Sequence, residues 1–525
     1  MTETQITTSY DEVPYESHPF PQSHPDRLAT IGRIFGMNPA DIKNCRVLEL
    51  GCASGGNLIP MAAILPQSEF IGIDVSSRQV GMGRKIINDL ELENIRLENV
   101  SILDVDQSWG LFDYIICHGV YSWVPSAVQE KIMAICAENL APQGIAYISY
   151  NTYPGWHMRE MIRHMMIYHA RQFTDNRQKI QQARALIEFL AKSVPTENNH
   201  YGMLLKSELE LIKRSKDYYL FHDHLEEVNI PLYFYQFAER AAKCGLQYLG
   251  EAEFHTMLTG GFPKEVEETL KRISPNIINT EQYMDFLRNR FFRQTLLCHG
   301  GIPLRRNLNP PSVYGLLVAS SARPVNPEVD INTTKVERFV TREGAQIETG
   351  SPVLKTSFII LSEQWPRALT FDDLVMKVRE KRGLSSEVEE QTKAEVGLSL
   401  LTAYSIRAVE FHTWQANFVS FVSDYPQVSK LAAYLVTMQG KTQVVNLRHE
   451  LVNLDGIAQN IIGFLNGTKD HKTLLEHLIN LTKKGILNIN QDGKRVTDEE
   501  TIRQTLDQAL KASLQKMAAS ALLVK

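Results

Sequence analysis

Short apolar runs alternate with longer amphipathic stretches along the first 150 residues. The runs that predict strands cover residues 46–50, 70–75, 95–100, 112–117 and 144–150. Apolar residues also recur at helical spacing, as at Leu28, Ile31 and Ile34 before the first strand. Helices that alternate with strands predict a Rossmann-like, doubly wound α/β sheet of parallel strands, whose ligands bind at the carboxyl ends of the strands.

The periodicity changes after the fifth strand. Residues 158–225 have helical spacing and no strand pattern, so we interpret them as a helical insertion. A helix at 232–242 and a strand at 245–252 follow, which indicates that the sheet domain resumes after the insertion. Residues 281–297 predict one more amphipathic helix.

Glycine and proline mark a domain boundary near residue 300, at Gly300-Gly-Ile-Pro303 and Asn309-Pro-Pro311. Beyond it, short strands at 336–340 and 408–414 flank a helix at 371–381, which is typical of a winged-helix-like module. We therefore predict four parts, which are a sheet domain with its insertion (1–300), a linker (301–330), a middle winged-helix-like domain (331–425) and a mainly helical C-terminal domain (426–525).

One stretch of the sheet domain has ligand-binding character, Val47-Leu-Glu-Leu-Gly-Cys-Ala-Ser-Gly-Gly-Asn57. It predicts a buried strand, then a glycine loop in which Gly51 turns the chain and Gly55 leaves room for a ligand. The helix that begins near Asn57 favours a carboxylate or phosphate at its N-terminus. Asp74 ends the second strand, where an acid accepts hydrogen bonds from ribose hydroxyls. The stretch predicts a site for a nucleoside that carries an anionic group.

The spacing of the loop discriminates between nucleosides. The dinucleotide fingerprint is G-x-G-x-x-G, whereas this loop reads Glu49-x-Gly51-x-x-x-Gly55-Gly56. An acid two residues before the first glycine departs from the NAD pattern and is similar to motif I of class I S-adenosylmethionine (SAM) methyltransferases. Because many α/β proteins have a glycine turn after their first strand, the context of the motif supports this interpretation more than the glycines do.

SAM has an amino-acid end, a ribose and an adenine, and each predicts its own contacts. We expect the amino-acid end on the glycine loop, the ribose on Asp74 and the adenine beside Ile102 and Leu103. Asp104 either contacts the adenine amine or caps its own loop. The predicted cofactor-binding residues are Tyr15, Glu49, Gly51, Cys52, Ala53, Gly55, Asn57, Asp74, Val75, Ile102, Leu103 and His118.

The first 30 residues are polar and proline-rich, and their X-Pro steps favour an extended chain. Two interpretations are open, a disordered arm and an ordered lid over the nucleoside pocket. Tyr10, Tyr15 and Phe20 are large groups to leave in water, so we favour the lid.

Aromatic residues follow the fourth and fifth strands, at 117–125 and 149–157. Aromatic faces attract sulfonium and ammonium groups, so these two loops predict a pocket for the methyl acceptor. The alternative is that the rings only pack the edge of the sheet. The predicted acceptor residues are Tyr121, Trp123, Asn151, Tyr153 and Trp156. His118 has no second ligand at metal spacing, and we predict no metal site.

Composition limits the partners and the compartment. A net charge of −5 without a dominant basic stripe argues against nucleic acid as the main partner. Six cysteines without C-x-x-C pairs indicate reduced thiols, and the N-terminus lacks a secretory pattern, so we expect a cytoplasmic protein. No apolar run reaches about 18 residues, so we expect no membrane span.

Four stretches, 14–25, 48–57, 118–125 and 150–156, together resemble bacterial class I methyltransferases with an attached regulatory domain. Among these, they resemble the rickettsial protein lysine methyltransferases that act on outer membrane protein B. The resemblance is specific in the first 160 residues and rests on architecture after residue 300. It implies SAM as the cofactor, lysine as the acceptor and an outer membrane protein as the substrate, and it allows a homodimer.

Other functions stay open from the residues alone. They are a methyltransferase for a small molecule or another residue type, an NAD(P)-binding protein, and a non-catalytic SAM-binding or docking protein. The residues after 300 carry no cofactor motif. We expect them to bind the protein substrate away from the reacting lysine, and the alternative is that they only stabilise the enzyme or its dimer.

Overall fold

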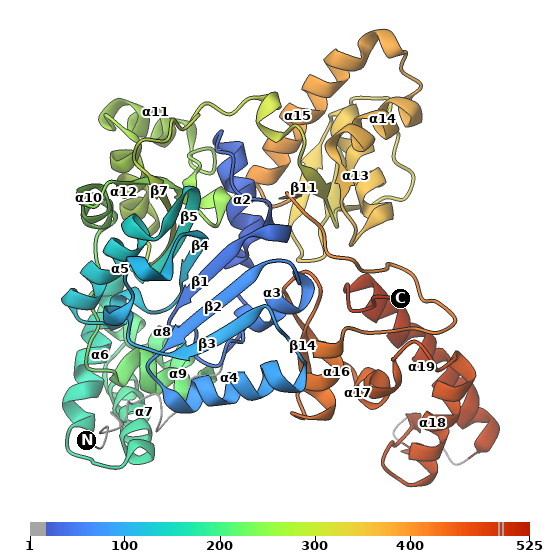
Figure 1. Ribbon diagram of the computed structural model, residues 1–525, viewed down its shortest axis with the longest axis horizontal. Helices are drawn as coiled ribbons and strands as arrows, with labels where there is room; N and C mark the ends of the chain where they lie inside the picture. The colour runs from blue at the N-terminus through green and yellow to red at the C-terminus, as the bar shows by residue number, and fades with distance from the viewer. Residues whose placement is uncertain (1–16, 492–493, 496–497) are drawn as a thin grey trace.

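A seven-stranded sheet lies at the centre of the first 300 residues (Figure 1). The computed structural model describes residues 17–491, 494–495 and 498–525. The strands have the spatial order β3-β2-β1-β4-β5-β7-β6, and β1 to β5 pair in parallel, as predicted. Their bounds are β1 (Arg46–Leu50), β2 (Glu69–Asp74), β3 (Ile95–Asn99), β4 (Phe112–Cys117), β5 (Leu140–Asn151), β6 (Leu246–Glu251) and β7 (Phe292–His299).

Helices cover both faces of this sheet. Successive side chains of a strand point to opposite faces, so Val47 packs into one core and Leu48 into another. The first core contains residues of α2 (Pro25–Ile34), α3 (Leu58–Ile64) and α4 (Ser77–Asp89). The second contains residues of α5 (Ser126–Glu138) and α10 (Phe234–Lys243). Because both faces are buried, the central strands consist mostly of apolar residues, which is why the sequence predicts them well.

The last strand, β7, was not predicted. The helix expected over 281–297 is confirmed for 281–288 and wrong beyond, because α12 (Ile277–Arg288) is capped by Asn289, whose φ of 47° is left-handed. The chain then extends into β7, which lies antiparallel between β5 and β6. Arg293 and Thr295 of this strand are polar and fully buried, so they break the apolar pattern by which a strand is recognised.

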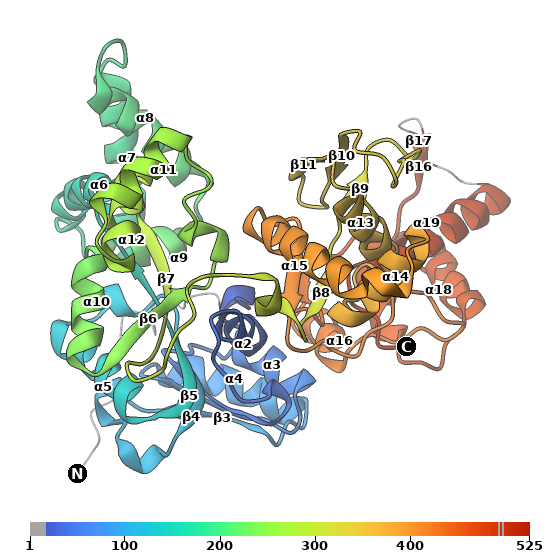
Figure 2. The ribbon, with the colours of Figure 1, turned by 90° about the horizontal axis from the view of Figure 1, so that it is seen from above.

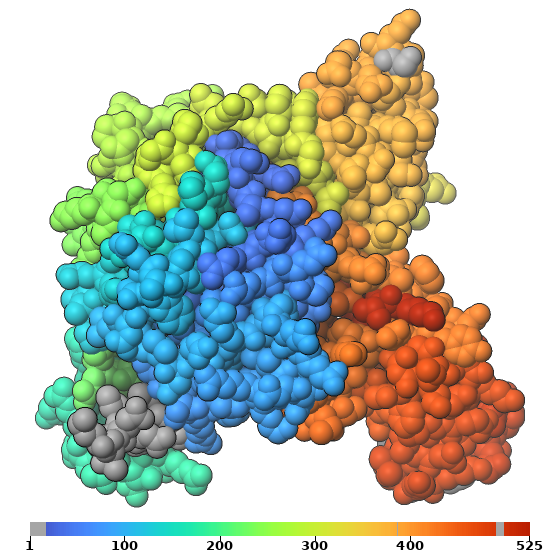
Figure 3. Space-filling view, in the orientation of Figure 1, coloured from blue at the N-terminus to red at the C-terminus, as the bar shows by residue number. Residues whose placement is uncertain are grey.

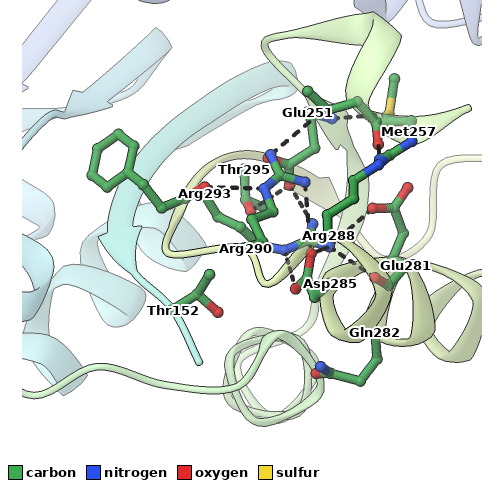
Figure 4. A network of polar contacts seen from close by, with 12 residues as sticks. Thr152, Glu251, Met257, Glu281, Gln282, Asp285, Arg288, Arg290, Arg293 and Thr295 are labelled. Atoms are coloured by element: carbon green, nitrogen blue, oxygen red, sulfur yellow. Dashed lines mark hydrogen bonds and ion pairs between the residues drawn. The ribbon is translucent and has the colours of Figure 1, made fainter. Parts of the chain in front are cut away.

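Arg293 is the centre of a buried ion cluster (Figure 4). Its guanidinium donates to Glu251 at 2.7 Å, Asp285 at 2.8 Å and Glu281 at 3.0 Å, and it lies 3.8 Å above the ring of Phe234. These partners come from β6, α12 and α10. Removing the arginine leaves Glu281 without an ion-pair partner among the described residues and leaves Glu251 and Asp285 with Arg290 alone, so the cluster holds these elements together.

The insertion between β5 and β6 is helical. It packs around a small core of its own, which includes Ile162, Ile180 and Leu205. Its elements are α6 (Trp156–Ala170), α7 (Asn176–Ser193), α8 (His200–Arg214), α9 (Asp217–Leu220) and a π-helical turn, η6 (Phe221–Leu225). A further helix, α11 (Lys264–Ile273), lies between β6 and α12.

The second half of the chain contains two further groups of elements. The first has a three-stranded sheet, β12-β8-β13, and a three-stranded sheet, β11-β10-β9. Its bounds are β8 (Leu317–Ala319), β9 (Arg323–Pro324), β10 (Glu337–Val340), β11 (Gln346–Thr349), α13 (Pro352–Gln364), β12 (Leu369–Thr370), α14 (Phe371–Arg382), α15 (Glu389–Ser405) and β13 (Glu410–His412).

The second group follows residue 425. Its elements are α16 (Lys430–Thr437), β14 (Gln443–Val445), β15 (Leu451–Asn453), α17 (Gly456–Ile461), α18 (His471–Lys483), β16 (Asn490–Gln491), β17 (Lys494–Arg495) and α19 (Glu499–Ala519). Within the described residues of the chain, no helix is both long and apolar enough to cross a membrane.

Helix α2 lies between the sheet and the second half (Figure 2). Its Asp26 carboxylate accepts the backbone N–H groups of Thr413 at 2.6 Å and Trp414 at 3.1 Å, and it contacts His412 at 2.7 Å. The apolar core of this face also continues across the junction. At the C-terminus, Val524 packs in a small cluster with Ile64 of α3, and the last residues lie beside the sheet domain in Figure 3.

The junction predicts a pH dependence of stability. Burial lowers the pKa of His412, but Asp26 and Glu410 outweigh it and raise the pKa from 6.5 to about 9. Because the pKa is higher in the folded state, protonated His412 contributes to the free energy of unfolding. This contribution is fully present below pH 6.5 and is lost as the pH rises through about 9. The shift corresponds to about 3 kcal/mol.

We therefore expect the thermal midpoint to fall between pH 6.5 and pH 9, and His412→Gln to reduce this fall. Buried Glu49, whose pKa is raised to about 8, accounts for part of the remaining fall below pH 8. His200→Gln, at an exposed histidine, is the control. Calorimetric scans across this pH range measure the thermal midpoints. An equal fall in wild type and His412→Gln would contradict the attribution of the pH dependence to His412.

Candidate functional site

A cavity of about 480 Å³ opens at the carboxyl ends of the central strands. This is where a doubly wound sheet binds its ligands. One end is formed by the glycine loop after β1 and by Asp74 at the end of β2. The other end is formed by residues of α6 and the α9–η6 region and by Phe291 and Phe292, beside the start of β7. The cavity therefore joins the glycine loop to side chains supplied by the insertion.

The glycine loop has little spare room on its outer side. Gly51 has a φ of 75°, and a Cβ there would lie 2.4 Å from the side chain of Val120. A Cβ on Gly56 would lie 2.6 Å from the carbonyl oxygen of Ser17. The N–H of Gly56 donates to the Ser17 hydroxyl at 2.8 Å. The loop therefore needs glycine for its own packing, and it turns bare backbone toward the cavity.

Glu49 is a buried acid, and only one of its two carboxylate oxygens accepts a hydrogen bond from the described residues. Its Oε1 accepts a hydrogen bond from Asn57 at 2.8 Å, while Oε2 has no hydrogen-bond partner among the described residues. Burial, assisted by the nearby charge of Asp74, raises the pKa of Glu49 to about 8. A cationic group at this end of the cavity would satisfy Oε2 and favour the ionised carboxylate. The ammonium group of the amino-acid end of SAM fits this requirement.

Asp74 anchors the loop as well as lining the cavity. Its carboxylate accepts the backbone N–H groups of Ala53 and Ser76, both at 2.9 Å. Ala53 has a left-handed φ of 49°, and this bond helps to hold it there. The predicted ribose contact remains open to Asp74 because a carboxylate accepts several hydrogen bonds at once.

His118 lines the cavity with an uncharged imidazole ring. Its Nδ1 lies 2.7 Å from the hydroxyl of Tyr147, and its ring packs 3.8 Å from that of Phe20. Burial lowers the pKa of His118 to about 3, so the imidazole is uncharged at neutral pH. Phe20 and Ser17 belong to the segment predicted as a lid, and both line the cavity. Residues 1–16 of that segment, Tyr10 and Tyr15 included, lie outside the described residues.

Most of the predicted cofactor residues meet at this cavity. Gly55 and Leu103 do not line it, because Gly55 turns back to bond Cys52 at 2.9 Å and Leu103 is 51% exposed. The predicted residues that do line it are Glu49, Gly51, Cys52, Ala53, Asn57, Asp74, Val75, Ile102 and His118.

Three of the five predicted acceptor residues line the cavity, namely Trp123, Asn151 and Trp156. The two indole rings meet edge to face, with centroids 6.0 Å apart. The other two predictions, Tyr121 and Tyr153, are corrected by the structure.

Tyr121 is fully buried in the core of the sheet. The short 3₁₀ turn Tyr121–Trp123 directs its ring onto Phe237, at 5.5 Å, and leaves Trp123 at the cavity. Tyr153 also lies outside the lining, because its ring stacks on His157 and its hydroxyl donates to Glu160 at 3.0 Å. For Tyr121, the alternative that the ring only packs against the sheet was the better interpretation, whereas Tyr153 contacts side chains of α6.

Several lining residues were missed from the sequence. They are mainly charged and aromatic side chains of the insertion and the start of β7, namely Arg159, Tyr219, His222, Asp223, Phe291 and Phe292. The insertion has no recognised motif, and residues 291–292 were placed inside a helix. The available signal was the run Tyr219-Leu-Phe-His-Asp223, where titratable groups interrupt an apolar segment.

Comparisons with known proteins agree with this architecture. Sequence profiles match residues 41–216 ("Methyltransferase domain"), 216–299 ("Predicted methyltransferase regulatory domain") and 424–522 ("PKMT, C-terminal winged helix domain"). RP789 of Rickettsia prowazekii is 38% identical, over 98% of this chain and 93% of its own length. PKMT2 from Rickettsia typhi, solved in complex with AdoHcy, is 32% identical and superposes with a TM-score of 0.87, over 98% of this chain and all of that one. The chain belongs to this family of SAM-dependent methyltransferases.

The family match changes how two segments are understood. The regulatory-domain profile, 216–299, contains β6 and β7, so that part of the chain completes the central sheet. The winged-helix profile covers 424–522, whereas the sequence had favoured a winged-helix-like module at 331–425. In the matched segment, β16 and β17 pair over only two residues each, which is too short to produce a strand pattern. The boundaries at residues 300 and 330 stay predictions.

Asp74 provides a test of the cofactor end. Charge-assisted hydrogen bonds to ribose hydroxyls contribute about 1.5–3 kcal/mol, so Asp74→Ala is expected to weaken SAM binding roughly 10- to 100-fold. Glu93→Ala, at an exposed acid in the loop before β3, should bind SAM like the wild type. Titration calorimetry measures both, with circular dichroism to establish folding. Unchanged affinity in folded Asp74→Ala would remove Asp74 from the cofactor site.

Proposed function

We propose that this enzyme transfers methyl groups from SAM to lysine side chains of a protein, and that its substrate is a bacterial outer membrane protein. The name of PKMT2, the structural relative, supports a protein lysine acceptor. The cavity independently supports a lysine acceptor, because the end opposite the glycine loop combines aromatic rings with an acid. We also propose that the reaction occurs in the cytoplasm, before the substrate is exported.

The observation that carries this proposal is the position of Asp223. It lies in the π-helical turn of the insertion and lines the same cavity as the glycine loop. Trp156 and Phe291 line the cavity with it, and Arg159 packs over both of their rings, at 5.7 and 4.5 Å. The Asp223 carboxylate beside these rings favours a cationic acceptor such as a lysine ammonium over a neutral one, and the Arg159 cation offsets part of this attraction.

Asp223 also has the proton affinity that this reaction needs. Burial raises its pKa to about 6, although Tyr219 and Arg159 oppose the rise. Lysine has a pKa of about 10.4 in water, so an ordinary Asp, at about 3.9, leaves a proton-transfer gap of about 9 kcal/mol. Asp223 reduces that gap to about 6 kcal/mol, and desolvation of the lysine in an aromatic channel reduces it further.

The residues of the chain then have separate tasks. SAM, when bound, supplies an electrophilic methyl group on its sulfonium. Glu49 and Asp74 hold and orient the amino-acid end and the ribose of the cofactor. The glycine loop lets the cofactor lie close to its bare backbone. Trp123 and Trp156 exclude water from the acceptor channel, and Asp223 attracts the lysine ammonium and accepts its proton. The neutral amine attacks in line, and positioning supplies most of the rate enhancement.

Substitution of Asp223 tests the acceptor site. With SAM saturating, kcat/KM of the wild type is expected to rise with pH through about 6, as Asp223 ionises. Asp223→Asn should lower kcat/KM about 10- to 100-fold at neutral pH and abolish this acidic limb. Asp217→Asn is the matched control, since Asp217 is an exposed acid of the same insertion that pairs with Arg184. An unchanged acidic limb in Asp223→Asn contradicts the role of this acid.

Mass spectrometry tests the substrate class. We expect lysine residues of outer membrane proteins to gain methyl groups after incubation with the enzyme and SAM, and to gain them about 10- to 100-fold more slowly when Asp223→Asn replaces the wild type. Methylation confined to small molecules, or to residues other than lysine, would refute the proposal while leaving the cofactor assignment intact.

A further inference from the structure

The turn between β14 and β15 reaches the cofactor loop from the C-terminal winged-helix segment. His449 occupies this turn with a left-handed φ of 62° and is only 2% exposed. Its Nε2 lies 2.9 Å from Oδ1 of Asn57, a residue 392 positions earlier in the chain. Asn57 lines the cavity and holds Glu49. A side chain of the C-terminal module therefore contacts the residue that organises the amino-acid end of the cofactor site.

The other hydrogen bonds of Asn57 show which residue donates in its contact with His449. Oδ1 of Asn57 also accepts the backbone N–H of Phe20 at 2.9 Å, and Nδ2 donates to Glu49 at 2.8 Å and Ser23 at 3.1 Å. The amide is thus oriented with its oxygen toward His449, so the imidazole donates through Nε2–H. Burial lowers the pKa of His449 well below its ordinary value, in keeping with a neutral ring.

The end of the chain holds the turn in place. Oδ1 of Asn446 accepts the N–H of Glu450 at 2.8 Å, and its Nδ2 donates to the carbonyl of Ser520 at 2.9 Å. The N–H of Leu447 donates to the carbonyl of Ala521 at 3.0 Å. Because Ser520 and Ala521 follow α19, the position of His449 is tied to the last helix of the winged-helix segment.

We propose that His449 is a positioning residue for the cofactor: it orients Asn57, and through Asn57 it holds Glu49 in the conformation that binds the amino-acid end of SAM. The C-terminal segment is then part of the cofactor site. A partner that binds this segment and shifts the turn changes the affinity for SAM, and by linkage SAM changes the affinity for that partner. The proposal depends on the use of SAM and not on lysine as the acceptor.

Two substitutions separate positioning from a purely structural role. Asn is well tolerated at a left-handed φ, so His449→Asn keeps the turn, but its amide is too short to reach Asn57. His449→Gln places an N–H donor at nearly the same reach as Nε2. We expect His449→Asn to bind S-adenosylhomocysteine about 5- to 30-fold more weakly than the wild type, and His449→Gln to recover to within about threefold.

Titration calorimetry of the full-length proteins with S-adenosylhomocysteine measures these affinities, and thermal midpoints report folding. In turnover assays, the loss in His449→Asn should appear in KM for SAM more than in kcat. A third variant, Asn446→Ala, loosens the turn without touching Asn57 and should weaken binding in the same direction. Wild-type affinity in folded His449→Asn, or equal losses in the Asn and Gln variants, would overturn the proposal. Failure of Asp223→Asn to affect methylation would leave it unaffected.

Discussion

A buried arginine must keep its counter-charges, and this constraint shapes the distal part of the sheet. Arg293 has no exposed surface and binds carboxylates from β6 and α12. The guanidinium is satisfied in the arrangement that places β7 antiparallel between β5 and β6. Phe291 and Phe292, just before Arg293, are thereby brought to the cavity. The ion cluster therefore determines one wall of the catalytic cavity without lying in it.

Buried charge recurs wherever distant parts of the chain meet. At the junction with the second half, Asp26 accepts several hydrogen bonds from the 412–414 segment, and the charged His412 also bonds Glu410. Both of these clusters pair buried acids with cations, and they act as structural joints. Glu49 differs, because the only hydrogen bond that its carboxylate accepts from the described residues comes from the neutral amide of Asn57. A buried acid without a counter-charge distinguishes the binding site from the joints.

The sequence predicted the parts of the fold whose signals are local. Strands β1 to β4 lie within a residue or two of their predicted positions, since strands buried on both faces consist mostly of apolar residues. The glycine-loop residues were found because the motif is contiguous. Tyr121 and Trp123 are two residues apart, and a 3₁₀ turn decides which ring reaches the cavity, which composition does not encode. Asp223 and His449 come from segments without a motif, and only the folded chain brings them to the site.

The contact between His449 and Asn57 has a consequence for biosynthesis. The glycine loop leaves the ribosome early, but the residue that orients it follows 392 positions later. The carbonyls that fix the turn belong to Ser520 and Ala521, almost at the end of the chain. A nascent chain that has emerged to residue 300 therefore contains the whole central sheet but not the finished cofactor site. Under the role proposed for His449, the full affinity for SAM is expected only after residues 446–521 have been synthesised and folded onto the sheet domain.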